Sequence, residues 1–437
     1  MKPELLYPDL SVNSEGRLVI AGFDAAGLVK SFGTPLMLLN EEKIRERCRV
    51  YTHALQTYFP AGSMALYASK ALSFRYIYKI AAQEGLGVDV VSPGELYTAF
   101  KADFPMERVY FHGNNKSDDD IAFAISHHTG CIVCDNPDEL AAIDAQAAKA
   151  GVTQNILLRL TPGIDPHTHA KISTGQIDSK FGAAIETGQA EALLCTALSH
   201  RHVSVRGVHC HIGSQIFDFA PFCDALTLML AFLAEMKTKH GFEAEQLNLG
   251  GGMGVPYVAG DPAIDYAANL RTIAKMLDEQ CRVHSLTPPA LLLEPGRSLV
   301  ADAGVTLYTV GGVKKIPGFK NYVSVDGGMS DNPRYTLYQS EYTIYLANRM
   351  NDTADFRCTV AGRCCESGDL IQENVLLPEP RRGDLIAVLT TGAYNYSMAS
   401  NYNRVPRPPV VMLTTDGPKV AVRRESLDDL IQNDLSC

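Results

Sequence analysis

The chain has 437 residues, enough for two or three domains, and its 46% hydrophobic and 20% charged residues are typical of a globular enzyme. A formal net charge of -10 argues against binding to nucleic acid or to an anionic membrane through overall charge. The first five residues lack the apolar stretch of a signal peptide, and no segment has the length of a transmembrane helix. We therefore expect a cytoplasmic protein without a membrane partner.

The 11 cysteines are odd in number and scattered, which suits a reducing compartment better than a disulfide framework. Cys131 and Cys134 have the CxxC spacing of some metal and redox sites. They lie inside a strand-like run and no second ligand pair follows, so we expect no metal there.

Between about residues 64 and 297, apolar runs typical of buried strands alternate with amphipathic, helix-like segments. The strand-like runs are residues 64–69, 86–92, 108–112, 131–135, 156–161, 205–213, 246–251 and 291–295. The helix-like segments include residues 73–84, 93–102, 137–150, 221–239 and 266–283. Eight such units in a row predict a (β/α)8 barrel of the TIM type, with a doubly wound open sheet as the alternative.

The rest of the chain has short β runs punctuated by glycine and proline. These runs are residues 18–21, 35–39, 304–310, 322–325, 356–361, 385–389 and 410–413. The predicted fold class is therefore α/β plus β. We expect a barrel domain over residues 39–297 and a second, mostly β, barrel-like domain formed by residues 1–38 and 298–437.

The carboxyl ends of the strands are where barrels of this type carry their chemistry, which directs attention to Lys70. Lys70 follows an apolar run, so its amine needs solvent or a partner. The simple interpretation is a strand-end lysine that reaches solvent, and the alternative is a Schiff base with a carbonyl cofactor. Other predicted strands also end in polar residues, among them Asp89, His112 and Arg159.

A glycine cluster follows the seventh predicted strand at Gly250, Gly251, Gly252 and Gly254. Backbone N–H groups can approach a phosphate closely there, because no Cβ intervenes. The competing interpretation is a flexible turn between a strand and a helix. The position favours a phosphate site, and Arg297, just past the eighth strand, could add a planar fork for a phosphate or carboxylate.

Glu294 ends the apolar eighth strand, so its carboxylate needs a cationic or hydrogen-bonding partner. A protonated pyridine nitrogen would serve, and Arg297 is the structural alternative. His211 offers a flat ring for stacking on an aromatic cofactor, although a core histidine has the same pattern. His209 points to the same face of a regular strand, so spacing does not choose between the two histidines.

Four short motifs form the most specific pattern in the chain. They are Tyr67-Ala68-Ser69-Lys70-Ala71, His211-Ile212-Gly213-Ser214-Gln215, Gly250-Gly251-Gly252 and Glu294-Pro295-Gly296-Arg297. Together they resemble the fold-type III pyridoxal-phosphate-dependent decarboxylases, the family that acts on ornithine, lysine, arginine and diaminopimelate. Within it, the chain is most similar to the branch acting on diaminopimelate, over nearly its whole length. Further support comes from Ser173-Thr174-Gly175, Ser179-Lys180-Phe181-Gly182, Asp326-Gly327-Gly328-Met329, Cys365-Glu366-Ser367-Gly368-Asp369 and Gly392-Ala393-Tyr394.

The resemblance implies pyridoxal 5'-phosphate as the cofactor. It assigns Lys70 to the Schiff base, Glu294 to the pyridine nitrogen and His211 to stacking on the ring. The other residues that it places around the cofactor are Asp89, Ser214, Gly250, Gly251, Gly252, Gly296, Arg297 and Tyr394.

The implied reaction is the decarboxylation of meso-2,6-diaminopimelate to L-lysine and CO2. The substrate would be held by Arg297, Arg334, Tyr338, Glu366 and Tyr394. Diaminopimelate has a distal ammonium and a distal carboxylate, which match the charges of Glu366 and Arg334. By its position alone, Arg334 could equally be a surface residue of a loop.

The resemblance also implies a homodimer with shared active sites. Cys365 and Glu366 would enter the site from the partner subunit. Either Cys365 or Lys70 would return a proton to the α-carbon after decarboxylation, and the sequence does not choose between them.

Three positions depart from the usual pattern of the family. Thr161 replaces a common asparagine, Gly368 stands where serine is common, and Cys364 adds a second thiol beside Cys365. None of them removes a named catalytic group, but they bear on the shape of the substrate end.

Three other interpretations compete with this one. A decarboxylase of the same fold could act on another basic amino acid or on a D-amino acid. A racemase favours arginine at the ring nitrogen, where this chain has Glu294. A non-catalytic regulatory homologue would be expected to lose the lysine or the cysteine, whereas this chain keeps Lys70 and Cys365.

Overall fold

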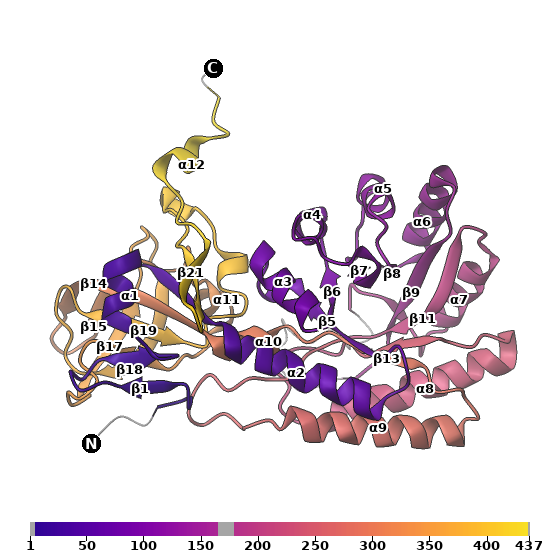
Figure 1. The fold of residues 1–437 in the computed structure, drawn as a ribbon, viewed down its shortest axis with the longest axis horizontal. Helices are drawn as coiled ribbons and strands as arrows, with labels where there is room; N and C mark the ends of the chain where they lie inside the picture. Colours follow the sequence, from indigo (N-terminus) through magenta and orange to yellow (C-terminus); the bar gives the residue numbers. More distant parts are fainter. Residues whose placement is uncertain (1–4, 165–178, 436–437) are drawn as a thin grey trace. The chain divides into compact units, whose positions relative to one another are not determined.

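The computed structural model describes residues 5–164 and 179–435, so the motif Ser173-Thr174-Gly175 lies outside the described residues. The chain forms two compact units (Figure 1). The first unit consists of Arg45–Gly254 and Ile264–Leu299. The second consists of the described parts of Met1–Ile44, Val255–Ala263 and Val300–Cys437.

Parallel strands in the first unit form a closed barrel, in the order β5-β6-β7-β8-β9-β11-β12-β13 with β13 pairing back to β5. Their bounds are β5 (Met64–Ala68), β6 (Gly87–Val90), β7 (Val109–Phe111), β8 (Cys131–Cys134), β9 (Gln154–Thr161), β11 (Val203–His209), β12 (Gln246–Asn248) and β13 (Ala290–Leu293). The two-residue β10 (Ala183–Ala184) adds to the edge of β9. This closure confirms the predicted (β/α)8 barrel.

One helix precedes the first barrel strand, others follow the strands in the chain, and they are seen around the barrel in Figure 1. They are α2 (Glu41–Tyr58), α3 (Arg75–Gln83), α4 (Pro93–Lys101), α5 (Asp118–Ser126), α6 (Pro137–Ala150), α7 (Gln189–Ser199), α8 (Ala220–His240), α9 (Tyr266–Val283) and α10 (Arg297–Val300), with the single turns η1 (Ser69–Ala71) and η2 (Met106–Arg108). Ser92, Ser117 and Asn136 begin α4, α5 and α6, because each side chain accepts a hydrogen bond from a backbone N–H three residues on.

A cluster of buried apolar side chains comes from five of the barrel strands: Leu66, Tyr110, Cys131, Val133, Leu157 and Leu292. Residues of this size on facing strands fill the interior, so the barrel is a packed core. The polar ends of the same strands are therefore held on a rigid frame.

The second unit is mostly β, as predicted. Its larger sheet contains β4 (Leu36–Asn40), β14 (Gly304–Lys315), β15 (Asn321–Val325), β16 (Ile344–Leu346), β17 (Phe356–Ala361), β18 (Leu370–Leu377), β19 (Leu385–Leu389), β20 (Val410–Thr414) and β21 (Gly417–Val422). A small sheet contains β1 (Leu10–Val12), β2 (Leu18–Ile20) and β3 (Phe23–Asp24). The short helical segments are α1 (Ala25–Phe32), η4 (Ala301–Ala303), α11 (Arg334–Tyr338), η5 (Tyr396–Met398), η6 (Tyr402–Arg404) and α12 (Leu427–Ile431).

The segment Val255–Ala263 belongs to the second unit, whereas the sequence pattern leaves it inside the barrel range. Two hydrogen bonds account for this: Tyr7 donates its hydroxyl to Pro256 O, and Thr343 donates its backbone N–H to Tyr257 O. No apolar periodicity in so short a segment could reveal contacts with residues so distant in the sequence.

The described cysteines are all free thiols, and no helix among the described residues is long and apolar enough to cross a bilayer. Cys131 and Cys134 are buried in β8, and burial raises the pKa of both thiols. Both residues therefore act as small apolar side chains of the strand.

Candidate active site

Lys70 lies in the η1 turn directly after β5 and is half-buried. The preceding Ser69 is fully buried and donates its hydroxyl to Glu95 Oε2 over 2.6 Å. The same oxygen accepts the backbone N–H of Val91 at 2.8 Å. These bonds tie the turn that carries Lys70 to the start of α4.

Gly296 brings the end of the eighth strand close to Lys70. A Cβ at Gly296 would lie 3.0 Å from the Cβ of Ala68 and 3.1 Å from that of Ala71. Ala68 also donates its backbone N–H to Pro295 O over 3.1 Å. The absence of a side chain at Gly296 therefore permits this close approach.

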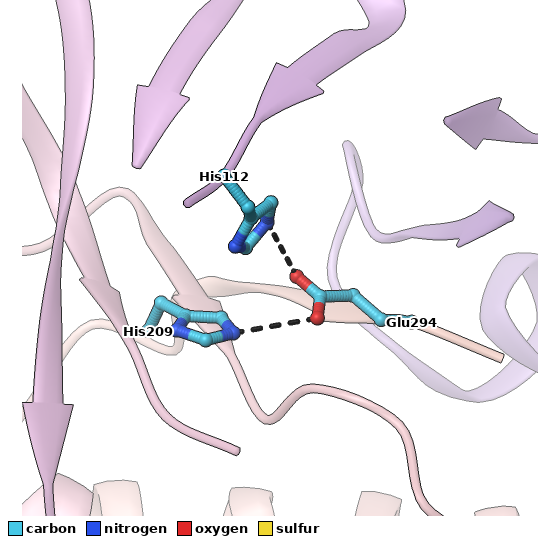
Figure 2. A group of neighbouring side chains, drawn as sticks. All are labelled: His112, His209 and Glu294. Atoms are coloured by element: carbon cyan, nitrogen blue, oxygen red, sulfur yellow. Dashed lines mark hydrogen bonds and ion pairs between the residues drawn. The ribbon is translucent and has the colours of Figure 1, made fainter. Parts of the chain in front are cut away.

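Glu294, directly after β13, is a carboxylate with only 6% of its surface exposed. Its Oε1 accepts a hydrogen bond from Asn248 Nδ2 at 2.8 Å and lies 2.8 Å from His112 Nε2. Its Oε2 lies 3.4 Å from His209 Nε2, and Figure 2 shows the two imidazoles on the two oxygens. Three barrel strands thus supply partners to one buried anion.

The histidines keep this carboxylate ionised. Burial acts to raise the pKa of Glu294, but His112 and His209, through charge and hydrogen bonding, hold the pKa well below its usual range. Burial lowers the pKa of His209 to about 4, so this imidazole is neutral at pH 7.

Asp89, at the third position of β6, is buried beside the same group. Its Oδ1 lies 3.8 Å from His112 Nε2. Burial, reinforced by the charge of Glu294, raises the pKa of Asp89 to about 6, while His112 and Lys70 oppose this rise. Asp89 and Glu294 therefore face the same imidazole with different proton affinities.

His211 and the glycine cluster are in contact. Gly251 donates its backbone N–H to His211 Nδ1 over 3.3 Å. Burial, followed by the nearby charge of Lys70, holds the pKa of His211 well below its usual range, so its ring is neutral. The two histidines that spacing could not separate thus have different neighbours: His209 contacts Glu294, whereas His211 contacts the glycine cluster.

The glycine cluster has no room for side chains. A Cβ at Gly251 would lie 2.0 Å from Glu294 O, and one at Gly252 would lie 2.2 Å from Gly213 O. Gly250 and Gly252 have φ values of 68° and 118°, which L-residues with a Cβ rarely adopt. The backbone of this segment is consequently packed against the chain around residues 210–216.

Arg297 lies at the neighbouring strand end and donates from Nη2 to Ser214 Oγ over 3.1 Å. Arg297 has only 6% of its surface exposed. The carboxylate of Glu294 contacts His112, His209 and Asn248, whereas Arg297 contacts Ser214. A cation, a hydroxyl and a bare glycine backbone instead come together beside Gly213.

The second unit holds the other predicted residues. Arg334 begins α11 and has only 6% of its surface exposed, so it is not the surface residue that its position alone suggests. Its guanidinium lies 5.0 Å from the ring centre of Tyr338 and 5.3 Å from that of Tyr394. The structure therefore brings these three predicted substrate residues together.

Cys365 and Glu366 are exposed on the loop between β17 and β18. The buried Asp369 holds this loop, since its carboxylate accepts the backbone N–H groups of Met329 and Cys364, both at 2.6 Å. Thr336 of α11 donates its hydroxyl to Gly368 O over 2.9 Å. The loop is thus fixed against the helix that carries Arg334 and Tyr338.

The structure shows what surrounds two of the departures from the family pattern. Thr161 donates its hydroxyl to Phe181 O over 2.7 Å, so the residue is used to anchor the chain after β9. A Cβ at Gly368 would meet its nearest atoms, in Glu366 and Thr336, at 3.9 Å, which is ordinary contact. Serine in this position would therefore fit, and glycine leaves slightly more space beside Glu366.

The sequence places His112 among the polar strand ends without indicating its role, and Asn248 was missed, although both lie where a barrel strand ends. The signal that could have found them is a polar residue within or just after an otherwise apolar run, such as Leu247-Asn248-Leu249. Their common partner, Glu294, could not be identified without the closed barrel.

The comparisons with known proteins agree with this geometry. Residues 41–301 match the family described as "Pyridoxal-dependent decarboxylase, pyridoxal binding domain". The chain belongs to the pyridoxal-dependent decarboxylases. It is 45% identical to diaminopimelate decarboxylase of Bacillus subtilis over 425 residues, which cover 97% of this chain and 96% of the relative.

Solved structures give the same result. The crystal structure of diaminopimelate decarboxylase from M. jannaschii with L-lysine has a TM-score of 0.91 and 34% identity, covering 98% of both chains. The enzyme from Helicobacter pylori with L-lysine has a TM-score of 0.85 and 32% identity, covering 94% of this chain and 98% of the other.

The residues present fit the cofactor of this decarboxylase family. The Gly250–Gly252 backbone has no room for a Cβ and lies beside the region of Ser214 and Arg297. Backbone N–H groups, a hydroxyl and a guanidinium together suit a phosphate. The ionised, buried Glu294 suits a protonated ring nitrogen, and the half-buried Lys70 suits an aldehyde.

Replacement of Gly252 tests the backbone cradle. In Gly252→Ala, the new Cβ meets the Gly213 carbonyl at 2.2 Å with φ at 118°, so we expect a loss of about 2–3 kcal/mol in the free energy of unfolding and weaker binding of pyridoxal phosphate. Denaturant titration and a cofactor titration measure both. Gly260→Ala is the matched control because its Cβ meets nothing within 4 Å. Equal behaviour of the two variants would contradict the cradle.

Proposed function

We propose that this chain decarboxylates meso-2,6-diaminopimelate to L-lysine and CO2, the last step of lysine biosynthesis. The observation that carries the proposal is the near full-length identity of 45% to a diaminopimelate decarboxylase. The geometry agrees, because a buried carboxylate, a basic cradle and a strand-end lysine meet at one end of the barrel.

The barrel residues would hold pyridoxal phosphate and set its charge. Lys70 would bind its aldehyde, and Ser214, Arg297 and the Gly250–Gly252 backbone would hold its phosphate. His211, neutral and beside the glycine cluster, would contact the ring. When bound, the cofactor supplies an electron sink for the bond that breaks as CO2 leaves.

Glu294 and Asp89 would control protons around the ring. The ionised Glu294 would keep a proton on the ring nitrogen, because an anion in a buried site stabilises a neighbouring cation strongly. Burial is the main cause that raises the pKa of Asp89 to about 6, so Asp89 would be less completely ionised than Glu294 near neutral pH.

Substrate choice would depend on the second unit. The distal carboxylate of diaminopimelate would pair with Arg334, which Tyr338 and Tyr394 flank, and the distal ammonium would pair with Glu366. Lysine and ornithine lack the distal carboxylate and would leave the buried guanidinium without its anion.

A homodimer with shared active sites would account for the exposed loop that carries Cys365 and Glu366. In such a dimer, this loop would be covered by the partner and would complete the partner's site. Cys365 and Lys70 are then the two candidates for returning a proton to the α-carbon. We also propose a cytoplasmic location, which fits thiols that are free throughout the described chain.

The reaction is tested by adding pyridoxal phosphate to the purified protein and supplying a substrate panel. We expect a visible absorbance band and the release of CO2 and L-lysine from meso-diaminopimelate. Decarboxylation of meso-diaminopimelate should be faster than that of lysine, ornithine, arginine or D-amino acids. Lys70→Ala should lose the band and nearly all activity, whereas Lys79→Ala, a change at an exposed lysine of α3, should retain both. A colourless wild-type protein, or faster turnover of another amino acid, would refute the proposal.

Removal of the Arg334 charge tests substrate choice. We expect Arg334→Met to lower kcat/KM for diaminopimelate by about tenfold or more, because a charge-assisted bond to the distal carboxylate is lost. Any turnover of lysine or ornithine should fall less. Exposed Arg357→Met is the matched control. Equal losses on all substrates would show that Arg334 does not read the distal carboxylate.

A further inference from the structure

His112 and His209 contact Glu294 in one buried group, and the proposed function gives neither histidine a role (Figure 2). The two imidazoles have 4% and 1% of their surface exposed, and their ring centres lie 4.8 Å apart at an interplanar angle of 70°. Each imidazole presents its Nε2 to a different oxygen of one carboxylate. Such an arrangement fixes both the position and the rotation of the carboxylate plane.

The backbone holds each imidazole in place. His112 donates its backbone N–H to Val90 O over 2.8 Å, just past the end of β7. Lys116, four residues further on, is buried and donates to Gly113 O and Val133 O, both at 2.8 Å, and to Glu139 at 2.7 Å. His209 is the last residue of β11 and is paired in register with Asn248. These bonds fix the backbone positions from which the two rings reach Glu294.

The proton positions follow from the chemistry of the partners. An ionised carboxylate only accepts hydrogen bonds, so the nitrogen that faces it must carry the proton. In His209, this leaves Nδ1 bare, and no partner faces Nδ1 among the described residues. A bare ring nitrogen in a buried position is consistent with the neutral imidazole at pH 7, because a buried N–H without an acceptor would cost more. His209 is therefore a neutral donor.

The two carboxylate oxygens are not equivalent. Oε1 has two close partners, His112 and Asn248, whereas Oε2 has only the longer contact with His209 among the described residues. Oε2 is thus the oxygen with acceptor capacity left for an additional donor.

We propose that His112, assisted by His209, is a positioning residue that fixes Glu294 as an oriented carboxylate for the ring nitrogen of the cofactor. This inference rests on the proposed function. His112 acts through Glu294 and needs no contact with the substrate. Its loss would leave a buried carboxylate with fewer donors, so that the anion would be both less stable and free to rotate.

A metal ion is the other ligand that two histidines and a carboxylate could hold. Ligands of a tetrahedral zinc ion at about 2.0–2.1 Å are about 3.3 Å apart. The 2.8 Å between His112 Nε2 and Glu294 Oε1 is shorter than this spacing between two zinc ligands and lies within the range of a charge-assisted contact between nitrogen and oxygen. The separation therefore favours a proton between these two atoms.

The test compares two ligands that differ only at the ring nitrogen: pyridoxal phosphate and its analogue with CH in place of that nitrogen. Equilibrium dissociation constants are measured by absorbance titration for the wild type, His112→Met, His112→Gln and His209→Met. We expect His112→Met to bind pyridoxal phosphate about tenfold or more weakly and the analogue as the wild type does. His112→Gln, which keeps a donor near the position of Nε2, should recover most of the affinity, and His209→Met should lose less.

The exposed His53→Phe is the matched control and should bind both ligands normally. Equal weakening of both ligands in His112→Met would show a merely structural role, and unchanged affinity would remove any role; either result overturns the inference. Stoichiometric zinc binding to the cofactor-free protein that competes with pyridoxal phosphate would also overturn it. Should His112→Met fail to fold, the comparison of the two ligands in His112→Gln and His209→Met decides. A wild type that binds the cofactor but releases no CO2 from diaminopimelate would instead refute the proposed function.

Discussion

The carboxylate of Glu294 is a buried anion, and the arrangement of the barrel end follows from what such an anion requires. Burial removes most of the water that would otherwise solvate this charge, so protein donors must stabilise it or the group must take up a proton. Asn248, His112 and His209 meet it from three strands, with Asn248 on the strand that pairs with β13 and the two histidines on strands further round the barrel. The result is a fixed negative charge in a site with little solvent, where it acts on a neighbouring cation more strongly than in water.

An anion and a cation lie close together in the sequence after the eighth strand. The eighth strand end carries both Glu294 and, three residues later, Arg297, yet the two side chains have different partners. Glu294 faces the histidines, while Arg297 faces Ser214 and, through it, the region of the bare glycine backbone. A ligand with a protonatable ring at one end and a phosphate at the other matches this separation. A single charge cluster could not offer both environments.

The barrel could be predicted because its strands are buried on both faces and appear as eight apolar runs. Lys70, the glycine cluster and Glu294 could be found because each interrupts such a run. The role of His112 could not be predicted, since its partner lies far along the chain and meets it only across the barrel. The burial of Arg334 was also hidden, because Tyr394, which packs on it, belongs to another part of the chain. β18 was missed because its burial is irregular, and its sequence Leu370–Leu377 has three polar residues between apolar ones.

Replacement of Glu294 by glutamine tests the central claim most directly, because it removes the charge while keeping the size of the side chain. Holoenzyme kcat for decarboxylation of meso-diaminopimelate should fall by about a hundredfold or more, since a neutral amide cannot hold a proton on the ring nitrogen. Affinity for the cofactor phosphate, and the free energy of unfolding, should change much less. A folded Glu294→Gln enzyme that retains kcat within threefold of the wild type would contradict the account.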